Sequence, residues 1–151
     1  MVTLAVMGVI VAATMSVLFS VYSQTGIVLN RRDVLGEGQI AMQQMTKQFR
    51  QATAINSSSA TSLSVETFTG PGDAHQIAWQ TSGSSAPYSL QKQTDGGPFT
   101  TVLTSLTTNT IFPAYVDTDL DGIVDQVRIE LSLGTKTATV VLTSDVQMRN
   151  R

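Results

Sequence analysis

The feature that most constrains this chain is a charge-free stretch at its start. Residues 1–30 contain no Asp, Glu, Lys or Arg, and most of the stretch reads MVTLAVMGVIVAATMSVLFSVY. An apolar run of this length can cross a bilayer as a helix. A cleavable signal peptide would carry basic residues before a shorter apolar core, and this run has neither feature. We therefore expect an apolar helix that must be buried on all sides, by lipid or by other protein.

The helix should continue past the apolar stretch with a different character. Residues 31–55 contain no Pro and are rich in Gln, Met, Ala, Lys and Arg, which favour helix. One apolar stripe recurs along this segment at helical spacing. Its members are Leu35, Met42, Met45, Phe49 and Ala52. The polar cluster that begins at Asn56 should end the helix. At 1.5 Å per residue the whole helix would be on the order of 75 Å long, far longer than one small domain needs.

Beyond Ser62 apolar and polar residues alternate, which predicts β-strands. SLSVETFT, HQIAWQT and PYSLQKQ read as strands, TDGG reads as a turn, and Gly134-Thr135 separates the last two strands as a hairpin would. We therefore expect an α+β protein in which an antiparallel sheet over residues 60–149 packs on the helix 31–55. The expected core includes Met42, Met45, Phe49, Trp79 and Tyr88. His75 should lie at the surface or at a strand edge.

The composition excludes several classes of function. The chain has no Cys, which removes disulfide scaffolds, Cys-based zinc sites and thiol nucleophiles. A single histidine, His75, argues against Ser-His-Asp catalysis and against a His-ligated metal. The net charge of −2 argues against binding nucleic acid by phosphate neutralisation. Since no nucleophile–base pair, phosphate loop or paired-acid site stands out, we expect a protein that is not an enzyme.

In organisation the whole chain resembles a type IV pilin or a type II secretion pseudopilin. Those proteins have an N-terminal apolar helix, a polar helical continuation packed on a sheet, and a Ser/Thr/Gly-rich β-domain. The passage MQQMTKQFRQATAINSSSATSLSV is similar to the helix-to-first-strand region of minor pilins and J-type pseudopilins, and VVLTSDVQMRNR resembles their last strand. The resemblance implies a pilin-like fold in a bacterial filament subunit. Its helix is first a membrane anchor and later the packed filament core.

The strongest motif of that family is not visible in this sequence. It consists of a Gly, a cleavage site, then Phe-Thr-Leu and a Glu at the fifth mature position. Thr3-Leu4 matches part of it, but the first glutamate here is Glu37. Either the sequence starts inside the usual motif, or this subunit does without the Glu. No residue of this chain can therefore be assigned the role of that Glu.

These features predict a structural subunit with two segments. Residues 1–30 would be the anchor and then the filament core, and residues 31–151 a globular domain. The expected partners are further copies in a helical homopolymer, the pilus or secretion assembly machinery, and the inner membrane before assembly. The subunit would lie in an extracellular filament at the cell surface, and in the membrane while unassembled. The side chains expected to touch neighbouring subunits are Val6, Val9, Ile10, Ala13, Val17 and Leu18.

Two other interpretations of the same organisation stay open. In the first, the chain is a minor pseudopilin of a type II secretion system. In the second, it is a monomeric, calcium-dependent surface binding domain that uses residues 1–30 only as a membrane anchor. Small and hydroxyl residues within the apolar helix favour assembly, because they permit close helix contacts that a pure lipid anchor needs less. These residues are Thr3, Gly8, Ala12, Ala13, Ser16 and Ser20.

An acidic loop, VDTDLDGIVDQV, is the most informative local motif. Its carboxylates stand at the first, third, fifth and ninth positions of an EF-hand-like calcium loop, with Gly122 at the sixth and a carbonyl at the seventh. The predicted ligands are Asp117, Asp119, Asp121, Asp125 and the Ile123 carbonyl. The twelfth position holds Arg128 in place of the usual Glu, so we expect a structural Ca²⁺ site of modest affinity. A solvated acidic turn is the alternative.

Overall fold

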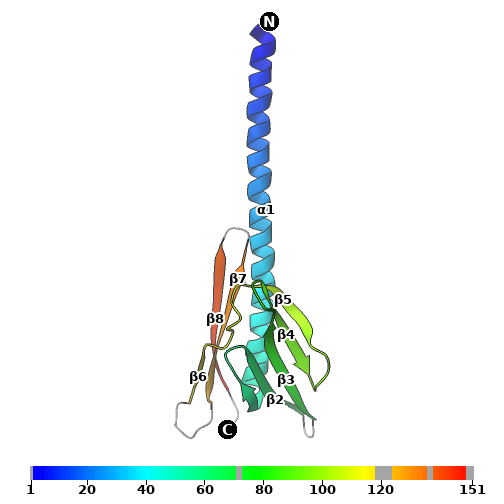
Figure 1. Ribbon diagram of the computed structural model, residues 1–151, viewed down its shortest axis with the longest axis vertical. Helices are drawn as coiled ribbons and strands as arrows, with labels where there is room; N and C mark the ends of the chain where they lie inside the picture. Colours follow the sequence, from blue (N-terminus) through cyan, green and yellow to red (C-terminus); the bar gives the residue numbers. More distant parts are fainter. Residues whose placement is uncertain (1, 71–72, 118–123, 136–137, 149–151) are drawn as a thin grey trace.

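The computed structural model describes residues 2–70, 73–117, 124–135 and 138–148. It begins with one helix, α1 (Val2–Arg50), of 49 residues. The first half of α1 extends beyond the rest of the molecule, and an antiparallel sheet packs on the second half (Figure 1). The predicted α+β class, with a long N-terminal helix and a pilin-like arrangement, is therefore confirmed.

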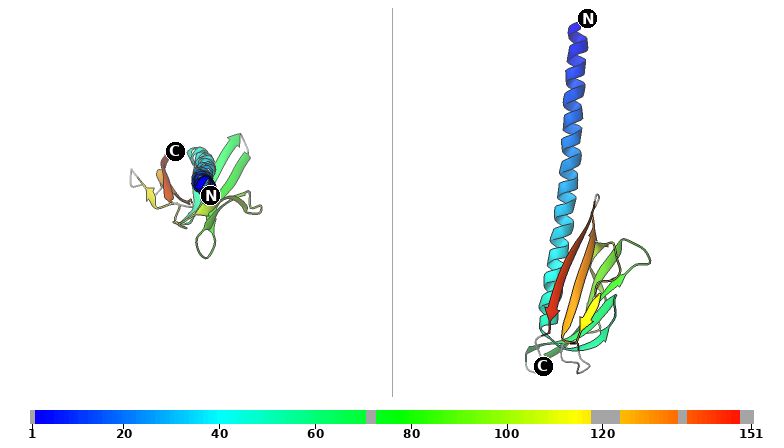
Figure 2. Two further views of the ribbon diagram at one scale, coloured as in Figure 1. Left: turned by 90° about the horizontal axis from the view of Figure 1, so that it is seen from above. Right: turned by 90° about the vertical axis from the view of Figure 1, so that its left-hand side faces the viewer.

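All the described strands belong to one antiparallel sheet. They are β1 (Ala52–Ser58), β2 (Ser62–Gly70), β3 (Asp73–Ser82), β4 (Tyr88–Thr94), β5 (Thr100–Leu106), β6 (Ala114–Val116), β7 (Gln126–Gly134) and β8 (Thr139–Gln147). Strands β1 to β5 pair in chain order, and β7 then joins β5 through the single pair Leu106↔Leu133. β7 pairs with β6 on one side and with β8 along its whole length. Seen along the helix axis, the sheet curves around α1 (Figure 2).

The core lies between α1 and the concave face of the sheet. Met45, Phe49 and Trp79 are fully buried there, and Met42 and Tyr88 are partly buried against them, so the predicted core is confirmed. Trp79 Nε1 donates a hydrogen bond of 2.8 Å to Gln48 Oε1, which ties β3 to the last turn of the helix. Gly38 lets the helix approach closely, because a Cβ there would meet the Cδ1 methyl groups of Leu133 and Leu142.

The predicted C-terminal end of the helix is wrong by five residues. The helix stops at Arg50 rather than at residue 55, and Ala52–Ser58 form β1, which pairs with β2. The β-branched Thr53 and Ile55 fit a strand, and pairing with β2 outweighs the helix propensity of the neighbouring alanines. In the segment TIFPAYV only Ala114–Val116 forms a strand, because Pro113 lacks the amide that a sheet ladder needs.

Candidate functional site

The half of α1 that extends beyond the sheet is the first candidate functional surface. Large apolar side chains are exposed along it, and Phe19 and Tyr22 are exposed by 73% and 75%. The others are Met7, Val11, Met15, Val17, Leu18, Val21, Val28 and Leu29. A continuous apolar surface of this extent on a soluble protein marks contact with a membrane or with another protein.

Two hydroxyl groups on this surface, those of Thr14 and Thr25, are turned back onto the helix itself. Thr14 Oγ1 donates to the Val11 carbonyl at 2.9 Å, and Thr25 Oγ1 donates to the Val21 carbonyl at 2.8 Å. Each hydroxyl is thus satisfied within its own helical turn, as is usual for Thr in apolar helices. The helix can therefore enter an apolar environment without leaving these donors unpaired.

The predicted filament contacts fall on this surface as far as the structure describes them. Ala13 is exposed, and Val17 and Leu18 are exposed by 63% and 51%. Val6, Val9 and Ile10 belong to the same helix, but their side chains lie outside the described part of the chain. In the described part of one subunit, no other residue covers Ala13, Val17 or Leu18.

A group of charged residues follows the apolar half directly. Arg31, Arg32, Asp33 and Glu37 are all exposed on α1, just before the helix meets the sheet. Charged side chains are costly in the centre of a bilayer and are placed outside it. By length and composition α1 can cross a membrane, a test that a signal sequence near an N-terminus would also pass. The charged group marks where such an apolar environment must end.

The predicted calcium loop connects β6 to β7. Its base is closed, since Val116 pairs with Gln126 and the Asp125 amide donates to the Val116 carbonyl at 2.8 Å. Asp119, Asp121 and Ile123 lie outside the described residues, so the predicted ligand set is not seen together. Among the described residues, no three His, Asp or Glu side chains lie close enough to hold a metal.

The residue at the twelfth position of that loop has another role. Arg128 is a strand residue of β7, and its guanidinium holds Asp145 of β8 through Nε–Oδ1 and Nη2–Oδ2 contacts of 2.7 and 3.2 Å. This ion pair raises the pKa of Arg128 and lowers that of Asp145. Both side chains are about half exposed, so the pair adds little stability. It does keep the cationic group turned toward β8.

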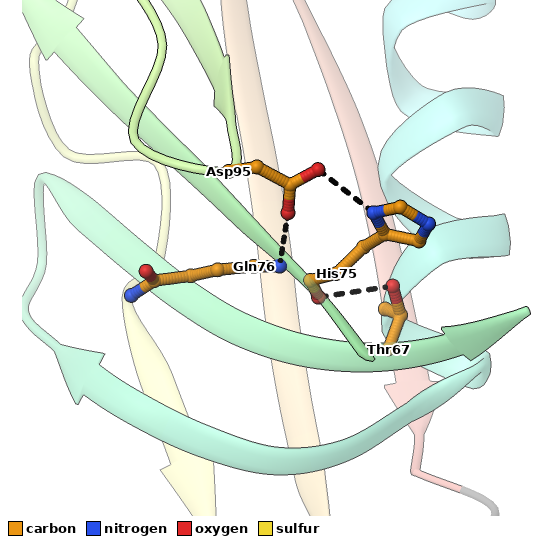
Figure 3. Close-up of polar contacts among 4 residues, drawn as sticks. All are labelled: Thr67, His75, Gln76 and Asp95. Carbon is orange, nitrogen blue, oxygen red and sulfur yellow. Dashed lines mark hydrogen bonds and ion pairs between the residues drawn. The ribbon is translucent and has the colours of Figure 1, made fainter. Parts of the chain in front are cut away.

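A second polar cluster, which the sequence analysis missed, surrounds His75 near the start of β3 (Figure 3). His75 Nδ1 lies 2.7 Å from Asp95 Oδ2, and the Gln76 amide donates to Asp95 Oδ1 at 2.9 Å. Asp95 has a positive φ of 51° in the turn after β4. The hydrogen bond to Asp95 raises the pKa of His75, and the same contact lowers the pKa of Asp95.

This cluster fixes a turn and does not form a nucleophile–base pair. The Thr67 hydroxyl donates to the backbone carbonyl of His75 at 3.3 Å, not to its ring (Figure 3). Asp95 uses both carboxylate oxygens to hold the β4–β5 turn against β3. The sequence signal that could have found it is TDGG, whose Asp suits a left-handed turn position. Its partner could be identified only once the β3–β4 register was known.

No family model, no curated protein and no solved structure matches this chain. The resemblance to pilins therefore rests on features of the chain itself: the charge-free helix, its amphipathic continuation and the sheet packed on that continuation. These features establish the fold class, and what they imply for function is a proposal.

Proposed function

We propose that the protein is the structural subunit of an extracellular, type IV pilus-like filament, and that it polymerises through its N-terminal helix. The observation that carries the proposal is the exposed apolar half of α1. It extends beyond a sheet whose apolar core residues are already buried against the other half of the same helix. Among the described residues of one subunit, none covers this half of the helix.

The energetics require some other cover for this surface. Removing one Val, Leu, Phe or Met side chain from water contributes about 1.5–3 kcal/mol. Several such side chains are at least half exposed on α1, so the isolated subunit would be insoluble in water. Lipid can cover the helix before assembly, and the same helix of neighbouring copies can cover it afterwards. The membrane anchor and the filament core are thus successive roles of one segment.

The sequence of the apolar half favours neighbouring helices as its final cover. Gly8, Ala12, Ser16 and Ser20 follow one another at intervals of four and so lie on one face of α1. Small residues at this spacing allow helix backbones to approach closely, which lipid alone does not require. A minor pseudopilin of a type II secretion system would use the same helix in the same way and is the nearest alternative.

A monomeric, membrane-anchored surface domain is the alternative from another class. It is favoured by the fact that α1 meets the length and composition of a membrane span. In that case the small residues of the helix would be incidental, and no fibre would form. The two functions therefore differ in whether the protein forms fibres outside the membrane.

The calcium loop is part of the proposal as a structural element. A Ca²⁺ ion held by Asp117, Asp119, Asp121, Asp125 and the Ile123 carbonyl would fix the connection between β6 and β7 and so orient the β7–β8 hairpin. The closed base of the loop supports this, because it brings the two ends of the loop together. Arg128 cannot also serve as a ligand, being a cation already paired with Asp145.

Electron microscopy of material sheared from the surface of cells that express the chain tests the proposal. We expect thin fibres that contain this protein as their repeating subunit. Monodisperse monomers in detergent, with no fibres on cells or in sheared material, would favour the anchored monomer and would refute the filament.

A further inference from the structure

A hollow of about 260 Å³ lies on the convex face of the sheet, the face turned away from α1. Its floor is one row of residues paired across β1, β2, β3 and β4: Ser57, Ser64, Ala78 and Gln93. Leu63 and Trp79 point into the core. Ser64, which follows Leu63 on β2, and Ala78, which precedes Trp79 on β3, therefore point to the opposite face of the sheet. The hollow is thus separate from the helix and from the acidic loop.

The hollow exists because the side chains of its floor are short and those around its rim are long. Ser57, Ser64 and Ala78 have small side chains, whereas Gln76 and Gln80 stand on either side of Ala78 along β3. Phe99, which follows the β4–β5 turn, also lines the hollow and is 38% exposed. The sheet surface therefore carries a shallow depression with amides and one aromatic ring around it.

Two side-chain amides of the hollow, those of Gln76 and Gln93, are oriented by hydrogen bonds. Gln76 Nε2 donates to Ser64 Oγ at 3.1 Å, and Gln93 Nε2 donates to the Gly97 carbonyl at 2.7 Å. Both amide carbonyl oxygens are left as acceptors with no partner in the described part of the chain. Ser64 is 7% exposed, so its hydroxyl is held in place.

The lining determines the class of ligand that the hollow fits. Of the described residues that line it, none is charged. An ionic ligand would lose water there without gaining a counter-charge. A purely apolar ligand would leave the oriented amide oxygens unpaired. A ligand with several hydroxyl groups and one apolar C–H face satisfies both the amides and the Phe99 ring.

We propose that this hollow binds one pyranose ring of an uncharged glycan. The volume lies below the range of about 300–1,000 Å³ typical of drug-sized ligands, which suits a single ring. The open, shallow shape predicts a weak site, with a dissociation constant of about 1–10 mM for a monosaccharide. The inference does not depend on filament formation, because the face is exposed in a single subunit.

The test is NMR titration of the full chain in a zwitterionic micelle. Alkyl glycoside detergents must be avoided, since their head groups would compete. The probes are the methyl glycosides of glucose, galactose and mannose, and N-acetylglucosamine, with methyl glucuronide and glucosamine as charged counterparts. We expect saturable shifts confined to the amides of the hollow for at least one neutral sugar, and weaker binding of its charged counterpart.

Two pairs of variants locate the site. Ala78→Gln fills the hollow and should weaken binding at least tenfold, whereas Ala74→Gln, an exposed position outside the hollow on the same face of β3, should leave it unchanged. Phe99→Ala should weaken binding about fivefold through loss of apolar contact. Phe68→Ala, which removes an aromatic ring that is 51% exposed and does not line the hollow, is its control.

Three results would overturn the proposal. The first is the absence of saturable shifts for every neutral sugar at about 50 mM, well above the expected dissociation constant. The second is equal or tighter binding of a charged counterpart. The third is undiminished binding by the Ala78→Gln variant. Unfolding midpoints of all four variants, measured alongside, separate loss of the site from loss of the fold. A variant that does not fold is replaced by Ala78→Asn or Phe99→Leu.

Discussion

Two glycines of α1 provide a matched test of how closely the helix packs on the sheet. Around Gly36 there is no atom within 4 Å of where a Cβ would stand, so Gly36→Ala adds a methyl group in open space. At Gly38 the same methyl group would run into Leu133 Cδ1 and would lie 3.2 Å from Leu142 Cδ1. Leu133 is fully buried, so its side chain cannot turn away without displacing its neighbours.

The two substitutions should change stability in opposite directions. Replacing a mid-helix Gly by Ala stabilises the helix by about 0.5–1 kcal/mol, and this gain is common to both variants. Overpacking a filled core costs about 1–3 kcal/mol, and only Gly38→Ala incurs it. The gain cancels in the difference, so Gly36→Ala should exceed Gly38→Ala in unfolding free energy by about 1–3 kcal/mol, or about 2–12 °C in Tm.

The fluorescence of Trp79 is the natural probe for this comparison. It is the only tryptophan, it is fully buried, and its indole donates to Gln48 of α1, so its emission reports directly on separation of helix and sheet. The full chain in detergent would be unfolded with urea and with heat. Equal stability of the two variants would show that α1 does not approach Leu133 as closely as described, and would refute the packing argument.

Three further predictions concern the other candidate sites. Ala13→Asp should abolish filaments while the sheet domain stays folded, because a carboxylate there costs about 2.5–3.5 kcal/mol in lipid and also disrupts a packed core; normal filaments would contradict this. Calcium at about a hundredfold excess over its dissociation constant should raise the unfolding free energy of the full chain by about 2.7 kcal/mol relative to chelator, and Asp119→Ala should abolish this difference. Equal melting temperatures of the unmodified chain with calcium and with chelator would show that the loop is an ordinary acidic turn. Asp95→Asn keeps an acceptor for the Gln76 amide but removes the charge, so the pKa of His75 should fall toward its usual 6.5 in an NMR titration. In the unmodified chain the His75–Asp95 pair should stabilise the fold most between pH 3.8 and 6.5. The contribution of His75 is lost as the pH rises through its raised pKa, and the contribution of Asp95 is lost as the pH falls through its lowered pKa.

Much of the fold could be predicted because it depends on periodicity along the chain. The helical spacing of Met42, Met45 and Phe49 identified the face that packs on the sheet, and the alternation after Ser62 identified the strands. The end of the helix could not be predicted in the same way. Residues 52–55 are acceptable in either state locally, and their pairing with β2 decides between them.

The sites that were missed all depend on contacts between distant residues. His75 meets Asp95 only because β3 and β4 pair in one register. The hollow on the convex face arises because three neighbouring strands, β1, β2 and β3, place small residues in one row. A shift of one residue in that register would turn each of these side chains to the other face. The Gln48–Trp79 bond likewise needs the position of the helix on the sheet.

Cysteine labelling can show whether neighbouring copies cover the apolar half of α1 in the filament. The chain has no Cys, so single cysteines can be placed at Leu18 and at Val141, which are exposed by 51% and 52% in one subunit. In lipid-free filaments sheared from cells, Leu18→Cys should resist a maleimide reagent until the filaments are dissociated, whereas Val141→Cys on the sheet should react at once. Equal, rapid labelling of both positions in intact filaments would show that residues 1–30 do not form the core.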